Sequence, residues 1–356
     1  MNVKNILKGA MPLCLLPNGR LVIYKRGCLS LIENENVIEE HTLFRTKKET
    51  RFWYPNIFIR LFRQGVRTAM AINEHSILLS VGSSLFEYDL SKRHKTDGVP
   101  FSKGVRPLIF TRIKNIKDFE DCVVFGGYRG NSNKEPVHIY KRKDTDKWEI
   151  VYTFESGLIN HVHNIIADPY RNCLWIFTGD FDESAAIWKV TDNFKKVERI
   201  LYNNQKFRGC VAFPVKDGLL YATDAPFAQN YIYLMKTDYN VLPLCQIDGS
   251  CIYGCQVGTN YVFSTTVEPD GRKNTLWRLF TYMKRGAGIK DMYVHMYAGN
   301  LEQGFKEIYK ERKDYWPYAF QFGAFRFPVG VNNTNKLYFQ PVATRENDLD
   351  LMMMEL

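Results

Sequence analysis

The sequence contains no apolar run that reaches the roughly 18 residues a membrane-spanning helix needs. Its first segment, MNVKNILKGAMPLCLLPNGR, has only a broken apolar stretch and no small-residue cleavage site of the kind that follows a secretion signal. We therefore expect a cytoplasmic protein without a membrane partner.

Long blocks of lysine and arginine are also absent. The chain has 48 Lys and Arg residues against 38 Asp and Glu residues, which gives a formal net charge of +10. A basic excess favours anionic partners. Because the charges are spread along the chain, we expect one focused anion site rather than a polybasic arm. We do not expect a nucleic-acid partner, because no recognised nucleic-acid-binding module occurs.

The eight cysteines lack the spacing of a structural zinc site. Cys251 and Cys255 form a close pair, but no second pair and no nearby histidine completes it. Six of the eight lie in or beside apolar runs, as Cys14 and Cys122 do. We therefore predict eight free thiols in a reducing compartment, with no disulfide and no bound cofactor.

The most informative feature of the chain is an internal repeat. Short segments rich in Val, Ile, Leu, Phe and Tyr are separated by turn dipeptides such as Asn18-Gly19 and Asp217-Gly218, which is typical of β-strands. Seven units, starting near residues 11, 67, 106, 163, 208, 253 and 326, each contain an apolar strand, a polar turn and a second apolar strand. Most units continue with two further strands. Repeated units of four antiparallel strands are the sequence signature of a β-propeller.

We therefore predict an all-β fold, a single β-propeller domain over residues 1–356 with seven four-stranded blades. The seventh unit shows only three strands, and the N-terminal segment 2–8 is expected to pair with them and close the ring. The stretch 282–318 is longer than a blade needs. We interpret it as an insertion within the sixth blade that includes a short helix over 301–313.

In a propeller, the first residue of each innermost strand lies beside the central axis. The residues at this aligned position are Met11, Arg67, Arg106, His163, Arg208, Tyr253 and Arg326. Arginine offers a planar fork of donors that suits carboxylate, sulfate or phosphate. No acidic residue occupies an equivalent position, so we predict that the four arginines bind an anionic ligand and that Arg67, Arg106 and Arg208 lack carboxylate partners. The alternative is a structural role, in which each arginine pairs with an acidic residue or with carbonyls of the next blade.

The loops that follow the second strands return to the same face and add Arg129, Asp180 and Asp224. We predict that Arg129 and Asp224 join the arginines in binding substrate. His161 and His163 share one face of a strand because side chains alternate there. Three roles are open to them: metal ligands with Asp180, general bases, or structural hydrogen-bonding groups.

The segment ADPYRNCLWIFTGD at 167–180, together with the arginines at the blade starts, resembles the broad BNR and sialidase-like propeller superfamily and uncharacterised bacterial propellers of polysaccharide systems. Several arginines around an axis are how that superfamily holds a carboxylate. The resemblance therefore implies a carbohydrate-active or carbohydrate-binding propeller with a central site for an acidic saccharide.

Two reactions fit such a site. A lyase needs arginine to neutralise a uronate carboxylate and a base to take the neighbouring proton; the candidate bases are His161, His163, Tyr128 and Tyr253. A hydrolase needs a nucleophile and an acid, for which the candidates are Tyr253, Glu268, Asp180 and Asp224. We name His161, His163, Asp180 and Tyr253 as candidate catalytic residues. Because a β-propeller fold does not by itself imply one function, the alternative is a non-catalytic scaffold or protein-interaction propeller.

Overall fold

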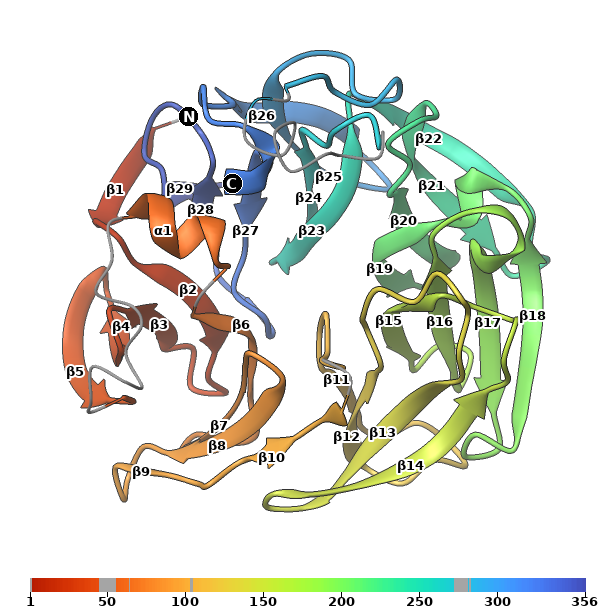
Figure 1. The fold of residues 1–356 in the computed structure, drawn as a ribbon, viewed down its shortest axis with the longest axis horizontal. Helices are drawn as coiled ribbons and strands as arrows, with labels where there is room; N and C mark the ends of the chain where they lie inside the picture. The colour runs from red at the N-terminus through yellow and green to blue at the C-terminus, as the bar shows by residue number, and fades with distance from the viewer. Residues whose placement is uncertain (1, 45–55, 64, 103–104, 272–280, 282) are drawn as a thin grey trace.

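The computed structural model describes residues 2–44, 56–63, 65–102, 105–271, 281 and 283–356. Its strands form seven sheets that surround a central axis like the blades of a propeller (Figure 1). In six of the sheets, the strand nearest the axis comes first in the chain and the later strands follow outward; in the seventh, β27, β28 and β29 follow this order and β1 is added outermost. The predicted all-β propeller with seven blades is confirmed.

The first three blades cover the N-terminal part of the chain. The first contains β2 (Met11–Leu15), β3 (Leu21–Lys25), β4 (Cys28–Glu33) and β5 (Asn36–Thr42). The second contains β6 (Val66–Ala71), β7 (Ser76–Val81), β8 (Ser84–Asp89), β9 (His94–Lys95) and β10 (Val99–Pro100), and both short strands pair with β8. The third contains β11 (Thr111–Ile113), β12 (Cys122–Gly126), β13 (Val137–Asp144) and β14 (Lys147–Phe154).

Four blades follow. The fourth contains β15 (His161–Asp168), β16 (Cys173–Gly179), β17 (Ala186–Thr191) and β18 (Lys196–Tyr202). The fifth contains β19 (Gly209–Val215), β20 (Gly218–Thr223), β21 (Asn230–Lys236) and β22 (Val241–Ile247). The sixth contains β23 (Ser250–Val257), β24 (Asn260–Thr266), β25 (Tyr293–Asn300) and β26 (Gly304–Arg312). The seventh contains β27 (Ala324–Arg326), β28 (Lys336–Val342), β29 (Leu351–Glu355) and β1 (Val3–Leu7).

The two ends of the chain close the ring. Strand β1 pairs antiparallel with β29, with Val3 opposite Met354, and so completes the seventh blade. The predicted closure is confirmed. Strand β29 therefore has a hydrogen-bonded neighbour on both sides, β28 and β1, and does not form an exposed sheet edge.

The hydrophobic core lies between the blades. Each pair of neighbouring blades shares one cluster of buried apolar side chains. Trp175, for example, is almost fully buried between the fourth and fifth blades, and its indole nitrogen donates to the buried carboxylate of Asp168 at 2.7 Å. Since this packing repeats around the ring, the inner strands hold their side chains at fixed places beside the axis.

The short helix predicted at 301–313 is wrong. Residues 304–312 form β26, which pairs with β25 as the outermost strand of the sixth blade. The polar, lysine-rich composition of this segment suits a helix, but a strand at the outer edge of a blade is largely exposed and tolerates the same residues. The extra length in this blade instead precedes β25, between 267 and 292. Residues 272–280 and 282 of that connection lie outside the described part of the chain.

Helical structure is confined to short segments. Among the elements whose residues are all described, they are α1 (Asn56–Leu61) and the 3-10 helices η2 (Asp182–Ser184), η3 (Gln205–Phe207) and η4 (Tyr318–Phe320). Helix α1 is held near the axis by Arg60, whose buried guanidinium pairs with Asp314 at 2.6 Å and with Asp348 at 3.0 Å. Within the described residues, no helix combines the length and the apolar character needed to cross a membrane.

All eight cysteines are free thiols, as predicted, and four of them are buried. Burial raises the pKa of Cys122 to about 11 and that of Cys173 to about 12, so these thiols stay protonated and unreactive at neutral pH. We expect a thiol reagent to titrate eight groups after denaturation without reductant and to react only slowly with the native protein. Six or fewer groups in the denatured protein would contradict this prediction.

Candidate functional site

β-Bulges decide which side chains reach the axis. Near the start of five innermost strands, the pairing with the second strand skips one residue. The skipped residues are Leu13, Arg67, His163, Cys210 and Ile252. A bulged residue has no paired partner, and its side chain can turn away from the regular face. All five line the central cavity of the propeller.

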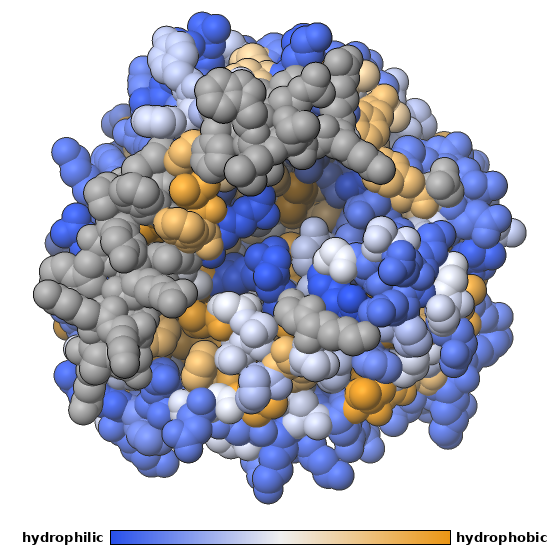
Figure 2. Space-filling view, in the orientation of Figure 1, coloured by the Kyte–Doolittle hydropathy of each residue, from blue (hydrophilic) through white to orange (hydrophobic). Residues whose placement is uncertain are grey.

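The central channel contains two adjoining cavities, of about 330 Å³ and about 240 Å³. They adjoin because Arg67, His163, Tyr253 and Arg326 line both. We call the smaller one the polar cavity, because charged and polar side chains make up much of its wall. Those side chains are Arg60, Arg63, Arg67, Tyr128, His163, Arg208, Asp224, Tyr253, Glu268, Gln321 and Arg326. Figure 2 shows that this face of the molecule is hollowed at its centre and that hydrophilic side chains gather in the hollow.

Arg208 has carboxylate partners, and the prediction that its donors would be free is wrong. Its buried guanidinium lies 3.2 Å from Asp224 and 3.2 Å from Asp180, and it also donates to the carbonyl oxygen of Asp180 at 3.1 Å. Burial opposes its charge, but the two carboxylates outweigh burial and hold the pKa of Arg208 above its ordinary value. Arg208 therefore neutralises acids that come from two different blades.

Arg67 and Arg106 differ from Arg208. Within the described residues, neither has a carboxylate within ion-pair distance, and the Nε atom of each is buried without a hydrogen-bond acceptor. Burial and the nearby charge of Arg106 lower the pKa of Arg67 to about 10. Among the described residues, Arg326 is bonded to neutral groups, with Gln321 accepting at 3.2 Å and the sulfur of Met11 at 4.0 Å. These three guanidinium groups concentrate positive charge on one side of the channel.

Two acids with incomplete hydrogen bonding lie on the opposite side. One carboxylate oxygen of Asp224 and one of Glu268 are buried without a donor. Burial raises the pKa of Asp224 to about 7, against the opposing charge of Arg208, and burial also raises the pKa of Glu268. The polar cavity is thus bipolar, with unfilled donors on the arginine side and unfilled acceptors on the acid side.

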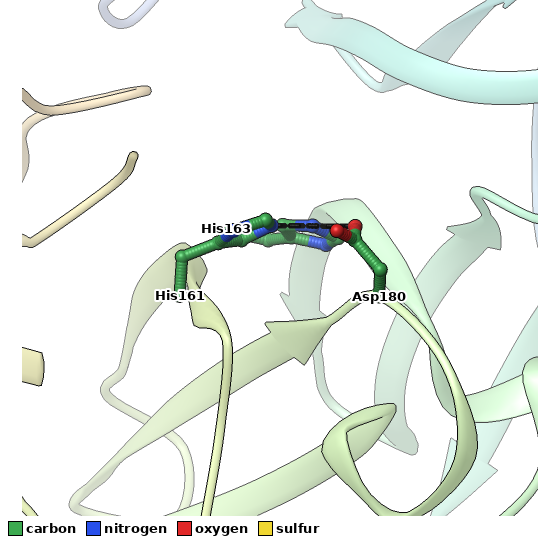
Figure 3. A group of neighbouring side chains, drawn as sticks. All are labelled: His161, His163 and Asp180. Atoms are coloured by element: carbon green, nitrogen blue, oxygen red, sulfur yellow. Dashed lines mark hydrogen bonds and ion pairs between the residues drawn. The ribbon is translucent and has the colours of Figure 1, made fainter. Parts of the chain in front are cut away.

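His161, His163 and Asp180 converge beside this cavity (Figure 3). The two Nε2 atoms are 3.1 Å apart, and they lie 3.3 Å and 3.6 Å from the same oxygen of Asp180. Burial lowers the pKa of His163 to about 4, so its ring is neutral at physiological pH. Burial opposes ionisation of Asp180, but the two histidines and Arg208 outweigh it and keep the pKa of Asp180 well below its ordinary value.

The predicted residues therefore separate into three groups. Six of them, Arg67, His163, Arg208, Asp224, Tyr253 and Arg326, line the polar cavity. Arg106, His161 and Asp180 lie next to those residues, as their contacts with Arg67, His163 and Arg208 show. Arg129 instead pairs with Glu135, in the loop that follows β12.

Sequence reasoning did not place Arg63, Cys210 or Gln321 at the site. Cys210 sits in an apolar stretch that looks like ordinary core, and only the bulge in β19 brings it to the axis. Arg63 and Gln321 lie outside the repeated strands, so the repeat contains no signal for them.

No family model and no curated protein matches this sequence. Solved structures do share its fold. The β-propeller domain of Myceliophteria thermophila Cps50 (Swd1) is 6% identical, with a TM-score of 0.58 and full coverage of both chains. A chain of a mitotic checkpoint complex is 8% identical, with a TM-score of 0.57 over 100% of this chain and 93% of that one.

A further similar structure is the extracellular domain of the one-component system BT4673 from B. thetaiotaomicron. It is 10% identical, with a TM-score of 0.56, and the match covers 99% of this chain but 40% of that one. At such identities the likeness shows the fold alone. The chain is a seven-bladed β-propeller, and no sequence match supports the resemblance to the BNR and sialidase-like superfamily.

Proposed function

We propose that the polar cavity binds an acidic saccharide whose carboxylate is held by Arg67, with the charge of Arg106 beside it. The observation that carries this proposal is the pair of buried Nε donors without acceptors and without a carboxylate within ion-pair distance among the described residues. A buried charge without a partner is costly, because desolvation is not repaid. A ligand carboxylate would supply the missing acceptor and the missing counter-charge.

The acid side of the cavity favours a sugar over a simple anion. The buried free oxygens of Asp224 and Glu268 need donors, and the hydroxyl groups of a sugar are donors. Fully ionised sulfate offers acceptors only. A cavity of about 240 Å³ is smaller than most ligand pockets, which suits a short saccharide better than a long polymer segment.

Whether a reaction follows binding stays a prediction. His163 and Tyr253 line the cavity, where a base for proton abstraction next to a uronate carboxylate would have to lie. Tyr128 is a poor candidate for that base, because burial raises the pKa of its hydroxyl above the ordinary value. A lyase would release an unsaturated sugar from a uronate-containing oligosaccharide, which ultraviolet absorbance detects directly.

Isothermal titration with single sugars tests the binding proposal. We expect galacturonate or glucuronate to bind, the matching neutral sugars galactose and glucose to show no binding, and sulfate to bind more weakly than the uronates. Equal binding of neutral and acidic sugars would contradict the role of the arginines. If no sugar and no anion binds, the alternative of a non-catalytic interaction propeller gains support.

Uronate binding should also depend on pH. Asp224, with its pKa raised to about 7, is ionised at pH 8 and protonated at pH 6, so acidification removes a negative charge from the wall. His163, with a pKa of about 4, stays neutral over this range. The dissociation constant should therefore fall by roughly three- to tenfold between pH 8 and pH 6, the size of one partly screened charge interaction.

The matched control is Asp224→Asn, which removes the titrating group but keeps its size. This variant should show a clearly smaller change over the same pH range, because the raised pKa of Glu268 then contributes alone. An identical pH dependence in wild type and variant would rule out Asp224 as the source.

A further inference from the structure

We propose that His161, His163 and Asp180 form a binding site for a divalent first-row transition-metal ion. The site lies at the start of β15, which carries both histidines, and at the end of β16, which is followed by Asp180 (Figure 3). Both histidine side chains are buried, and the carboxylate is about one-third exposed. The proposal is independent of the acidic saccharide, because none of its ligands is an arginine of the cavity.

The hydrogen bonds of the two rings fix their tautomers. His161 Nδ1 lies 3.1 Å from the carbonyl oxygen of Arg129, and His163 Nδ1 lies 3.1 Å from the carbonyl oxygen of Gly209. A carbonyl oxygen only accepts, so each Nδ1 carries the proton. In neutral rings both Nε2 atoms then present lone pairs, and these lone pairs face each other across 3.1 Å. Two nitrogen lone pairs and a carboxylate oxygen therefore meet at one point, and the only donor that the described residues bring to this oxygen is Arg208.

The distances between the three atoms suit coordination to one ion. Ligands about 2.1 Å from a metal lie about 3.0–3.4 Å apart in octahedral or tetrahedral geometry. The observed separations are 3.1, 3.3 and 3.6 Å, so one point lies within bonding distance of all three atoms. Two imidazoles and one carboxylate on one side of an ion are a donor set typical of Zn²⁺ and Fe²⁺ sites that keep open positions.

The surroundings support the ligands. Metal-binding histidines usually donate their other ring proton to a backbone carbonyl or a carboxylate, as both rings do here. Gly179 leaves room for the His163 ring, since a Cβ atom at this position would come within 2.3 Å of it. Arg208 donates to the same Asp180 oxygen at 3.2 Å, and because a carboxylate oxygen has two lone pairs, it can accept this bond and bind a metal together.

A second histidine cluster provides a contrast. His295 also has acids around it, but Nδ1 pairs with Glu307 and Nε2 lies 3.0 Å from Asp291. Both of its nitrogens lie against carboxylates, so among the described residues neither a backbone carbonyl nor a second histidine orients this ring. Among the described histidines, the pair on β15 alone directs two ring nitrogens at a common point.

The test is a Zn²⁺ titration of the full chain after treatment with a chelator, followed by calorimetry and by metal analysis of the dialysed protein. We expect one equivalent of Zn²⁺ in wild type. His161→Ala and Asp180→Asn should each weaken binding by at least about a hundredfold, since even indirect partners of a metal cost 10–100-fold. His295→Gln is the matched control and should bind like wild type. Loss of binding in His295→Gln with retention in His161→Ala would overturn the proposal, as would wild type that binds no Zn²⁺.

A cobalt spectrum gives a readout that does not depend on how the variants fold. Co²⁺ bound by two imidazoles and a carboxylate shows visible d–d bands without a thiolate charge-transfer band. Cys210, His163 and Asp224 also lie close together, and a charge-transfer band would place the ion on the Cys210 sulfur and overturn the assignment. Uronate binding by the arginines is measured in a separate titration. Failure of the metal proposal is therefore distinguishable from failure of the saccharide proposal.

Discussion

Replacing Arg208 with alanine is expected to lower the free energy of unfolding by about 3–5 kcal/mol, the usual cost of breaking a buried ion pair from one side. The guanidinium is buried between Asp180 and Asp224 and is their shared cation. Its removal leaves the fully enclosed Asp224 beside Glu268 without a counter-charge. Urea denaturation of wild type and variant at pH 8, where Asp224 is ionised, measures the difference.

The double variant Arg208→Ala with Asp224→Asn is the control for this mechanism. If the loss comes from an uncompensated carboxylate, the neutral amide should restore part of the stability of Arg208→Ala. The loss should also shrink at pH 6, because Asp224 with its pKa near 7 takes up a proton there. A stability change below about 1 kcal/mol would mean that water compensates the acids in place of the arginine.

Replacing Arg67 with alanine should have the opposite profile. We expect uronate binding to weaken by about 1.5–3 kcal/mol, the range for a hydrogen bond to a charged group. Stability should be unchanged or slightly higher, because the Nε of this side chain is buried without an acceptor and its charge is close to Arg106. Calorimetric titration with galacturonate, paired with urea denaturation, separates the two effects.

Arg112 offers a matched control for this experiment. It is an exposed arginine of the neighbouring innermost strand, and its guanidinium donates to backbone carbonyls, including that of Ile72 at 2.8 Å. Arg112→Ala should leave uronate binding unchanged. If Arg67→Ala unfolds the protein, or binds uronate as well as wild type does, then the unpaired arginines have a structural role and the saccharide proposal fails.

The amino-acid sequence by itself determined the architecture of the ring. In a strand that buries one face, apolar and polar residues alternate, and the turns between strands need particular residues. Both patterns can be recognised in a short stretch of sequence. Repetition of that window predicted seven blades, and the unmatched seventh unit predicted that β1 would pair with β29. The exception was 301–313. An outer strand with little burial shows almost no alternation of apolar and polar residues, so its sequence resembles that of a helix.

The tertiary structure alone decided the chemistry at the axis. The sequence repeat aligns Arg67 with Arg208, whereas in the structure the bulged position of Arg67 corresponds to that of Cys210. The sequence does not show this difference, because one extra residue in a strand changes neither its composition nor its spacing in a recognisable way. Arg208 is neutralised by Asp180, which reaches it from the fourth blade, whereas no described acid reaches Arg67. Contacts between blades join residues far apart in the chain, and their partners depend on angles and distances that only the closed ring sets.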